Sequence, residues 1–160
     1  MDGKRGLIGS PEELAFTADG GESWTGLPVP AKVGMIAAVS LSEEAGALRV
    51  RLLDENGDLW TSDDRGATWA QLQRPFKAPV FESMTAPRAA MRFTPGGEGV
   101  VAVILDEGSP KGHVYRTRDA GKTWQEEPLA GFPVSVVTLS SDGKLLTTFD
   151  QYTIRLYRAE

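Results

Sequence analysis

Cysteine is absent from the 160 residues, and histidine occurs once, as His113. Without thiols the chain forms no disulfide and no thiolate metal site. No apolar run approaches the ~20 residues of a membrane-spanning helix. No apolar segment follows the first six residues either, so the sequence as it stands predicts no signal peptide and, by default, a cytoplasmic location.

Positive charge is also scarce. Lys and Arg number 17 against 22 Asp and Glu, which gives a formal net charge of −5, and the basic residues are scattered along the chain. Nucleic acids and anionic membrane surfaces attract a basic footprint, so neither is expected as the main partner. The 18 glycines and 10 prolines predict many tight turns and few long helices.

One pattern, (Ser/Thr)-x-Asp-x-Gly-x-(Ser/Thr)-Trp, occurs three times, at residues 17–24, 62–69 and 117–124. Its tryptophans are 45 and 55 residues apart. This spacing is close to the length of one four-stranded propeller blade, about 40–50 residues. The residues that define the pattern are Thr17, Asp19, Gly21, Ser23, Trp24, Ser62, Asp64, Gly66, Thr68, Trp69, Thr117, Asp119, Gly121, Thr123 and Trp124.

The segments before the second and third motifs follow one plan. Two apolar runs and a short third run precede each motif, and turn sequences such as Glu-Asn-Gly join them. A further strand is expected to begin at each tryptophan. We therefore predict blades of four antiparallel strands, A to D, with the motif as the C–D turn. Strands A, B and C are expected at residues 33–41, 48–53 and 58–61, and again at 89–94, 100–105 and 113–117.

The motif has the composition of a turn closed by its own side chains. An aspartate in a turn accepts hydrogen bonds from nearby backbone N–H groups, and Ser or Thr hydroxyls satisfy further backbone groups. The glycine is expected where φ is positive, because it adopts that region without steric cost. The tryptophan is expected to bury a large apolar area in the sheet. A structural role is therefore favoured for all three motifs.

These motifs resemble the Asp-box (BNR) repeats of sialidases, of sortilin-type receptors and of photosystem II assembly and stability factors. The resemblance implies an all-β fold of β-propeller blades over most of the chain. It also implies that Asp19, Asp64 and Asp119 are structural, since the box usually lies at the blade periphery, away from the ligand face. Because the box recurs in enzymes, receptors and assembly factors, the fold does not choose among these functions.

The two ends of the chain resemble each other, since residues 141–160 align with residues 1–20 as strands that precede a motif. The expected strand order is B-C-D, A-B-C-D, A-B-C-D and A-B-C. We predict a single propeller segment, residues 1–160, with blade bounds of 1–30 (partial), 31–74, 85–129 and 132–160 (partial).

Such a segment is interpreted as part of a larger propeller, most simply its C-terminal half. A four-bladed ring with two trimmed blades and a ring of two or more chains are the alternatives. Open blade edges and apolar faces aggregate unless they are covered. A protein partner, or self-association through the open edges, is therefore expected.

No catalytic constellation accompanies these strands. No nucleophile-elbow sequence accompanies His113, and this residue is expected at a strand edge or the surface. Residues 54–58 form a dense cluster of side-chain oxygens without the spacing of a calcium loop, and they are expected to be a hairpin turn. No catalytic residue, metal or cofactor is predicted.

The leading interpretation is a non-catalytic scaffold that binds a protein or other macromolecule. The alternative is a fragment of a sialidase-like glycoside-binding or glycoside-hydrolysing propeller, with a glycan as ligand. A sialidase needs converging arginines, and the expected A strands are poor in charge, which favours the scaffold. The candidate arginines for such a channel site are Arg49, Arg51, Arg88, Arg92 and Arg116.

A longer connection at residues 73–88 separates the second and third blades. Three of its apolar residues, Phe76, Phe81 and Met84, are candidates for a partner patch, because exposed apolar loops carry function or cover a core. Packing of this segment over the blade is the alternative.

Overall fold

The computed structural model of the chain describes residues 3–44, 46–77, 89–105, 111–127, 136–140, 145–149 and 154–158. These residues form strands and turns and no helix, which confirms the all-β prediction. It follows that the described part of the chain holds no helix long and apolar enough to span a membrane.

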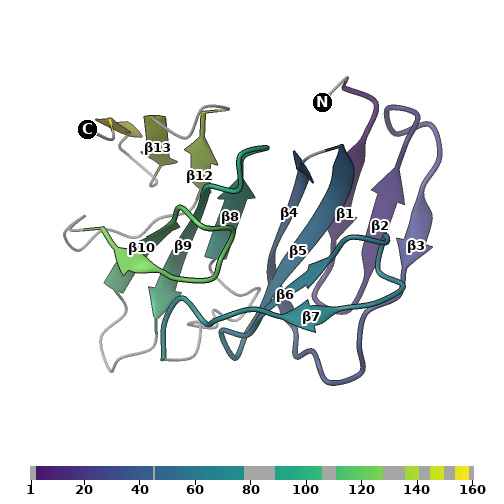
Figure 1. The fold of residues 1–160 in the computed structure, drawn as a ribbon, viewed down its shortest axis with the longest axis horizontal. Coiled ribbons are helices and arrows are strands. Elements are labelled where there is room, and N and C mark those ends of the chain that lie inside the picture. Colours follow the sequence, from purple (N-terminus) through teal and green to yellow (C-terminus); the bar gives the residue numbers. More distant parts are fainter. Residues whose placement is uncertain are drawn as a thin grey trace.

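Four antiparallel sheets follow one another along the chain (Figure 1). In each sheet the strands lie side by side in sequence order, as expected of successive hairpins. The first sheet contains β1 (Gly6–Gly9), β2 (Leu14–Thr17) and β3 (Thr25–Leu27). The second contains β4 (Ile36–Glu44), β5 (Ala47–Asp54), β6 (Leu59–Ser62) and β7 (Ala70–Gln71). The third contains β8 (Ala89–Phe93), β9 (Gly99–Leu105), β10 (Lys111–Thr117) and β11 (Gln125–Glu126). The fourth contains β12 (Val136–Leu139), β13 (Leu145–Phe149) and β14 (Ile154–Arg158).

The sheets are arranged as a fan in Figure 1, with the first sheet in purple at one end and the fourth in yellow-green at the other. The leading strands of successive sheets lie against each other, β4 beside β8 and β8 beside β12. The first sheet places β1 beside β4. Successive four-stranded sheets that meet along their inner strands are the layout of a partial β-propeller, in agreement with the predicted fold class.

Two apolar clusters hold the first three sheets together, one in each gap between neighbours. The second sheet contributes to both, because alternate residues of a strand point to opposite faces. The gap between the first and second sheets contains Leu14, Phe16, Leu27, Ile36, Leu41, Val50, Leu52 and Trp60. The gap between the second and third contains Leu53, Leu59, Phe76, Met91, Phe93, Val101, Val103, Leu105 and Tyr115. All seven residues of β9 are buried, as the apolar run at 100–105 predicts.

Phe93 is at the centre of the contact between the second and third sheets. Its backbone N–H donates to the Ser40 hydroxyl on β4 at 3.1 Å, and its ring meets the Trp124 ring edge-on at 6.0 Å between centroids. Gly99 is the cross-strand partner of Phe93. A Cβ atom on Gly99 would overlap the Phe93 ring. The absence of a side chain at Gly99 is therefore what allows the ring to lie across β9.

Gly99→Ala is expected to destabilise the chain by about 1–3 kcal/mol, because the added methyl group forces Phe93 out of its packed position. The matched control is Gly96→Ala, where the nearest atom to the new Cβ is Thr94 Oγ1 at 3.8 Å. The control is expected to change stability by no more than about 0.5 kcal/mol. Urea melts of both variants measure the difference, and equal losses would contradict this packing.

Candidate functional site

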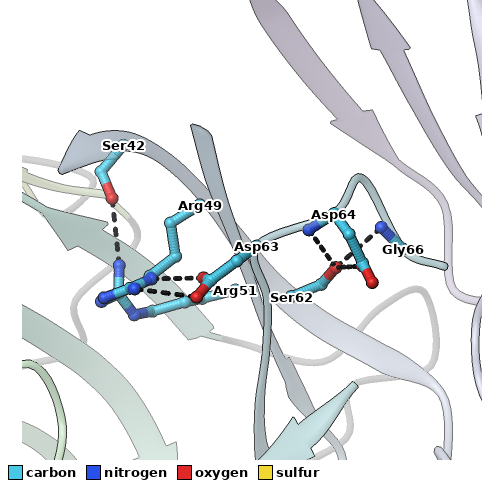
Figure 2. A network of polar contacts seen from close by, with 7 residues as sticks. All are labelled: Ser42, Arg49, Arg51, Ser62, Asp63, Asp64 and Gly66. Carbon is cyan, nitrogen blue, oxygen red and sulfur yellow. Dashed lines mark hydrogen bonds and ion pairs between the residues drawn. The ribbon is translucent and has the colours of Figure 1, made fainter. Parts of the chain in front are cut away.

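The three motif turns contain the same internal hydrogen bonds. In the second turn, Asp64 Oδ1 accepts the Thr68 backbone N–H and the Ser62 hydroxyl, each at 2.8 Å. Asp64 Oδ2 accepts the Thr68 hydroxyl at 2.6 Å. The Ser62 oxygen accepts the Gly66 N–H at 2.8 Å (Figure 2). The same set recurs among Thr17, Asp19, Gly21, Ser23, Thr117, Asp119, Gly121 and Thr123.

Two consecutive residues in each turn have left-handed backbone conformation. The motif glycine has φ values of 98°, 84° and 92° in the three turns, as the sequence predicts. The residue before it is also left-handed. In the first turn this residue is Gly20, with φ of 83°, but in the other two turns it is Arg65, with φ of 58°, and Ala120, with φ of 62°. The sequence does not predict a positive φ at these two non-glycine residues. A Cβ atom in this region costs roughly 1–2 kcal/mol. The hydrogen bonds of the aspartate therefore hold the second and third turns against a local steric cost.

The motif carboxylates have low pKa values for a structural reason. The hydroxyl of Ser23 holds the pKa of Asp19 far below its ordinary value, and the backbone N–H of Ser23 adds to the effect. The Thr68 hydroxyl lowers the pKa of Asp64 to about 2, and the Thr123 hydroxyl lowers the pKa of Asp119 to about 2. Carboxylates that stay ionised and fully hydrogen-bonded do not exchange protons near neutral pH. The aspartates of these turns therefore have a structural role, as hydrogen-bond acceptors that hold each turn closed.

The second and third turns each lie against the preceding sheet. Trp69 Nε1 donates to the carbonyl oxygen of Pro28, directly after β3, at 2.9 Å. A Cβ atom on Gly66 would be 2.9 Å from the same oxygen. In the third turn a Cβ atom on Gly121 would be 3.1 Å from Leu72 Cδ1, directly after β7. The motif glycine thus has two functions, because it allows both the positive φ and the close approach of the sheets.

The three motif tryptophans differ in burial. Trp69 and Trp124 are half-buried and pack against the two apolar clusters, whereas Trp24 is 42% exposed. The reason is geometric: each indole packs at the rim of a sheet rather than within it, so its burial depends on what the preceding sheet supplies.

A buried arginine lies between the second and third sheets. Arg51 is 1% exposed, and its Nη1 donates to the Ser42 hydroxyl at 3.0 Å (Figure 2). Its guanidinium lies 3.9 Å from the centroid of the Phe93 ring. Arg49 forms a two-pronged ion pair with Asp63, with Nη2 to Oδ2 at 2.9 Å. This hydrogen bond from Arg49 lowers the pKa of Asp63.

The other arginines do not join this pair. Arg116 is buried and its Nε donates to Glu127 Oε1 at 2.7 Å. Arg92 is exposed on β8, and Arg88 lies outside the described residues. Of the candidate arginines that the structure describes, Arg49 and Arg51 therefore lie near Asp63, whereas Arg92 and Arg116 lie elsewhere, on the third sheet.

The oxygen cluster at residues 54–58 is a hairpin turn between β5 and β6, as predicted. Asp54 Oδ1 accepts the backbone N–H groups of Asn56 at 3.0 Å and Asp58 at 2.9 Å. Burial raises the pKa of Asp54, while these hydrogen bonds oppose the rise. Within the described residues no group of three His, Asp or Glu side chains is placed to hold a metal ion.

The single histidine lies on the third sheet. His113 Nδ1 is 2.7 Å from Glu126 Oε1 on the neighbouring β11, and its ring stacks on Tyr115 with 6.2 Å between centroids. These contacts link β10 to β11 across the sheet, in keeping with the strand position expected for His113.

Of the three residues of the expected partner patch, the structure describes Phe76 alone. Phe76 is 6% exposed and packs against the Tyr115 ring at 5.5 Å between centroids, so it belongs to the core and presents no surface to a partner. This burial corresponds to the packing alternative. Phe81 and Met84 lie outside the described residues.

Two adjoining grooves are present at the first sheet, and no sequence pattern predicts them. One, of about 500 Å³, is lined by Ile8, Glu12, Glu13, Ala15, Gly26 and Val29, among others. The second, of about 360 Å³, is lined by Pro11, Glu12, Val29, Pro30, Val33 and Met35, among others. Glu12 and Val29 border both grooves. Their apolar walls with a few polar groups are typical of binding surfaces.

Comparison with known proteins supports the fold. No protein-family model matches the sequence. Among curated proteins, the chain is 26% identical over 137 residues to the chloroplastic photosystem II stability/assembly factor HCF136 of Arabidopsis thaliana. That match covers 77% of this chain and 32% of the relative, so the chain spans about a third of the length of the curated relative.

Solved structures are similar over nearly the whole chain. YCF48 bound to a D1 peptide matches with a TM-score of 0.55 and 20% identity, over 98% of this chain and 52% of that one. A GH74 enzyme of Niastella koreensis matches with a TM-score of 0.61 and 16% identity, over 90% and 23%. A protein of unknown function from Dyadobacter fermentans matches with a TM-score of 0.56 and 20% identity, over 92% and 48%. The chain has a β-propeller-like fold.

The turn carboxylates predict a characteristic response to acid. The folded-state pKa of Asp64, about 2, is below the ordinary value of 3.8, so its stabilisation is present above pH 3.8 and is lost as the pH falls towards 2. Asp64→Asn is expected to lower the urea midpoint at pH 7 and to flatten the decline between pH 4 and pH 2. Thr68→Val, which removes the main cause of the low pKa, is expected to give an intermediate slope. An unchanged slope in Asp64→Asn would contradict this assignment.

The contact between turn and preceding sheet predicts unequal costs for one substitution at two equivalent sites. Gly66→Ala and Gly21→Ala both place a Cβ atom at positive φ, at roughly 1–2 kcal/mol. Only Gly66→Ala also drives the methyl group into Pro28, which adds about 1–3 kcal/mol. Denaturant melts of the two variants measure the difference, and equal losses would show that the second turn does not depend on the first sheet.

Proposed function

We propose that this chain is a non-catalytic β-propeller scaffold that binds a protein partner. The main observation behind the proposal is that the potentially reactive side chains are held in hydrogen bonds and ion pairs within the fold. The motif aspartates are hydrogen-bonded within their turns, while His113 and Arg116 each pair with a glutamate at the outer edge of the third sheet. Because these groups make structural contacts, the described surface supports binding better than it supports catalysis.

The similarity to known proteins supports the same class. The curated relative is named as a stability/assembly factor, and one similar solved structure, YCF48, is bound to a D1 peptide. Both names describe proteins that act through other proteins. This chain spans about a third of the curated relative and about half of YCF48. The proposal therefore concerns the repeat region alone.

The motif turns are proposed to be Asp-box repeats, and the four sheets to be blades or partial blades with bounds at 1–30, 31–74, 85–129 and 132–160. The recurrent hydrogen bonds around Asp19, Asp64 and Asp119 support this assignment. In this assignment, the box residues position the sheets and do not contact the ligand.

The groove of about 360 Å³ is the proposed contact surface for the partner. Met35 is 38% exposed in it, beside Pro11, Pro30 and Val33, and Glu12 supplies a negative charge at its border. A wall of prolines and a flexible thioether fits an extended apolar segment, and the carboxylate favours a basic residue next to it. The expected ligand is therefore an extended peptide with apolar and basic side chains.

Selection of a displayed peptide library on the immobilised chain tests this function. Enriched peptides are expected to be apolar and basic, and Met35→Arg is expected to weaken their binding by at least about tenfold in fluorescence polarisation. The control Ile8→Arg, an exposed apolar residue of the neighbouring groove, is expected to bind as the wild type does. A screen of sialosides and other glycosides serves as the second arm. Failure to enrich any peptide, or binding or cleavage of a glycoside, would favour the glycan-directed alternative instead.

A further inference from the structure

The outer face of the first sheet corresponds, in the repeat, to faces of the second and third sheets that are covered by a neighbouring sheet. Leu14, Phe16 and Leu27 point into the cluster shared with the second sheet. Because successive residues of a strand alternate between faces, the cross-strand row of Ile8, Ala15 and Gly26 lies on the opposite, outer face. Ile8 is 52% exposed there.

The matching rows of the next two sheets are covered by the sheet that precedes each of them. In the second sheet the row is Leu52 opposite Trp60, both buried against the first sheet. In the third it is Val101 opposite Tyr115, both buried against the second sheet. The chain therefore shows twice what covers this kind of face, and the cover is the preceding sheet of the same repeat.

The first motif turn is formed in full but lacks the contact that the other two make. Gly66 and Gly121 are buried under the preceding sheet, whereas Gly21 is exposed. Within the described residues, a Cβ atom on Gly21 would meet only the Trp24 ring, at 3.7 Å. Trp24 is 42% exposed, while Trp69 reaches the Pro28 carbonyl of the sheet in front of it. Trp24 is therefore equivalent to Trp69 in the repeat, but within the described residues no preceding sheet contacts it.

The outer face is also shaped to receive side chains. Where the next sheets have Trp60 and Tyr115, this row has Ala15, and Gly26 follows it on β3. The groove of about 500 Å³ lies at this place, with Ile8 and Ala15 in its wall and Glu12 and Glu13 among its lining residues. An apolar hollow with acidic residues beside it fits a surface that offers apolar and basic side chains.

We propose that this face is an interface for a second copy of this chain, whose fourth sheet takes the place of the preceding sheet. This goes beyond the proposed binding function and does not depend on it. Within the chain, each sheet packs against the one before it. The same order continues when the fourth sheet of one copy packs against the first sheet of the other. The edge strand β14 ends at Arg158, which is opposite in charge to Glu12 and Glu13. Two copies each cover the other's first face and complete one closed assembly.

The length of similar proteins agrees with this arrangement. The chain spans 52% of the YCF48 chain and 48% of the Dyadobacter fermentans chain, while almost all of its own residues match. Two copies of this chain together therefore have about the length of either of those chains. A closed ring also covers the terminal faces of a repeat array, which otherwise remain exposed to water.

Sedimentation velocity of the 160-residue chain from about 1 to 100 µM tests the interface. The expected species has twice the 17.2 kDa of one chain. Ile8→Arg is expected to weaken the association at least about tenfold without loss of the β-sheet circular dichroism signal, because it buries a charge in the apolar hollow. The control Met35→Arg replaces an apolar residue that is also exposed, at 38% against 52% for Ile8, but that lies in the neighbouring groove, and it is expected to leave the association unchanged.

Charge reversal identifies the sheet that occupies the face. Glu12→Lys with Glu13→Lys is expected to weaken the dimer, and mixing this variant with Arg158→Glu is expected to restore association between the two. A chain that stays at 17.2 kDa over the whole range, equal losses in Ile8→Arg and Met35→Arg, or a charge reversal without rescue would each overturn the proposal.

Discussion

The hydrogen bonds of one carboxylate across each motif turn are the interaction on which the rest of the structure depends. Asp64 binds the N–H and hydroxyl of Thr68 and the hydroxyl of Ser62, and so closes the link between β6 and β7. The closed turn holds Arg65 and Gly66 at positive φ. That conformation turns the glycine towards the sheet in front, where the absence of a side chain lets the two sheets approach. A local polar contact thereby becomes a condition for packing between sheets.

Contact between sheets is carried by different chemistry in the two gaps. The gap between the first and second sheets is closed by leucines and by the Trp69 hydrogen bond to Pro28. In the gap between the second and third sheets, the Phe93 backbone donates to Ser40 and the Arg51 guanidinium lies over the Phe93 ring. The repeat therefore sets the spacing of the sheets, while individual side chains adapt each gap to its neighbours.

The sequence predicts the elements that depend on local chemistry. The motif spacing, the Asn-Gly turn and the apolar runs indicate the all-β fold, and residues 100–105 are buried throughout, as their composition predicts. What it misses depends on neighbours distant in sequence. Trp24 is exposed because no sheet precedes it within the described residues, and Phe76 is buried because its ring packs against Tyr115 of the next sheet. The burial of Arg51 is invisible in the pattern because an arginine on an alternating strand normally points to water. The grooves beside Ile8 and Met35 arise from the gaps between a turn and a linker, which no local pattern encodes.

The row of polar contacts around Phe93 makes the order of the repeats specific. Apolar sheet faces are permissive, because one leucine surface fits another with small adjustments. Ser40 and Arg51 place a hydrogen-bond acceptor and a buried cation on one side of a single gap, and Phe93 supplies the matching donor and aromatic ring on the other. A sheet that lacked either half would leave a buried polar group without its counterpart. The second and third sheets are consequently a matched pair, and exchanging either of them for another sheet of the repeat would separate the Ser40 hydroxyl and the Arg51 guanidinium from the groups that they meet.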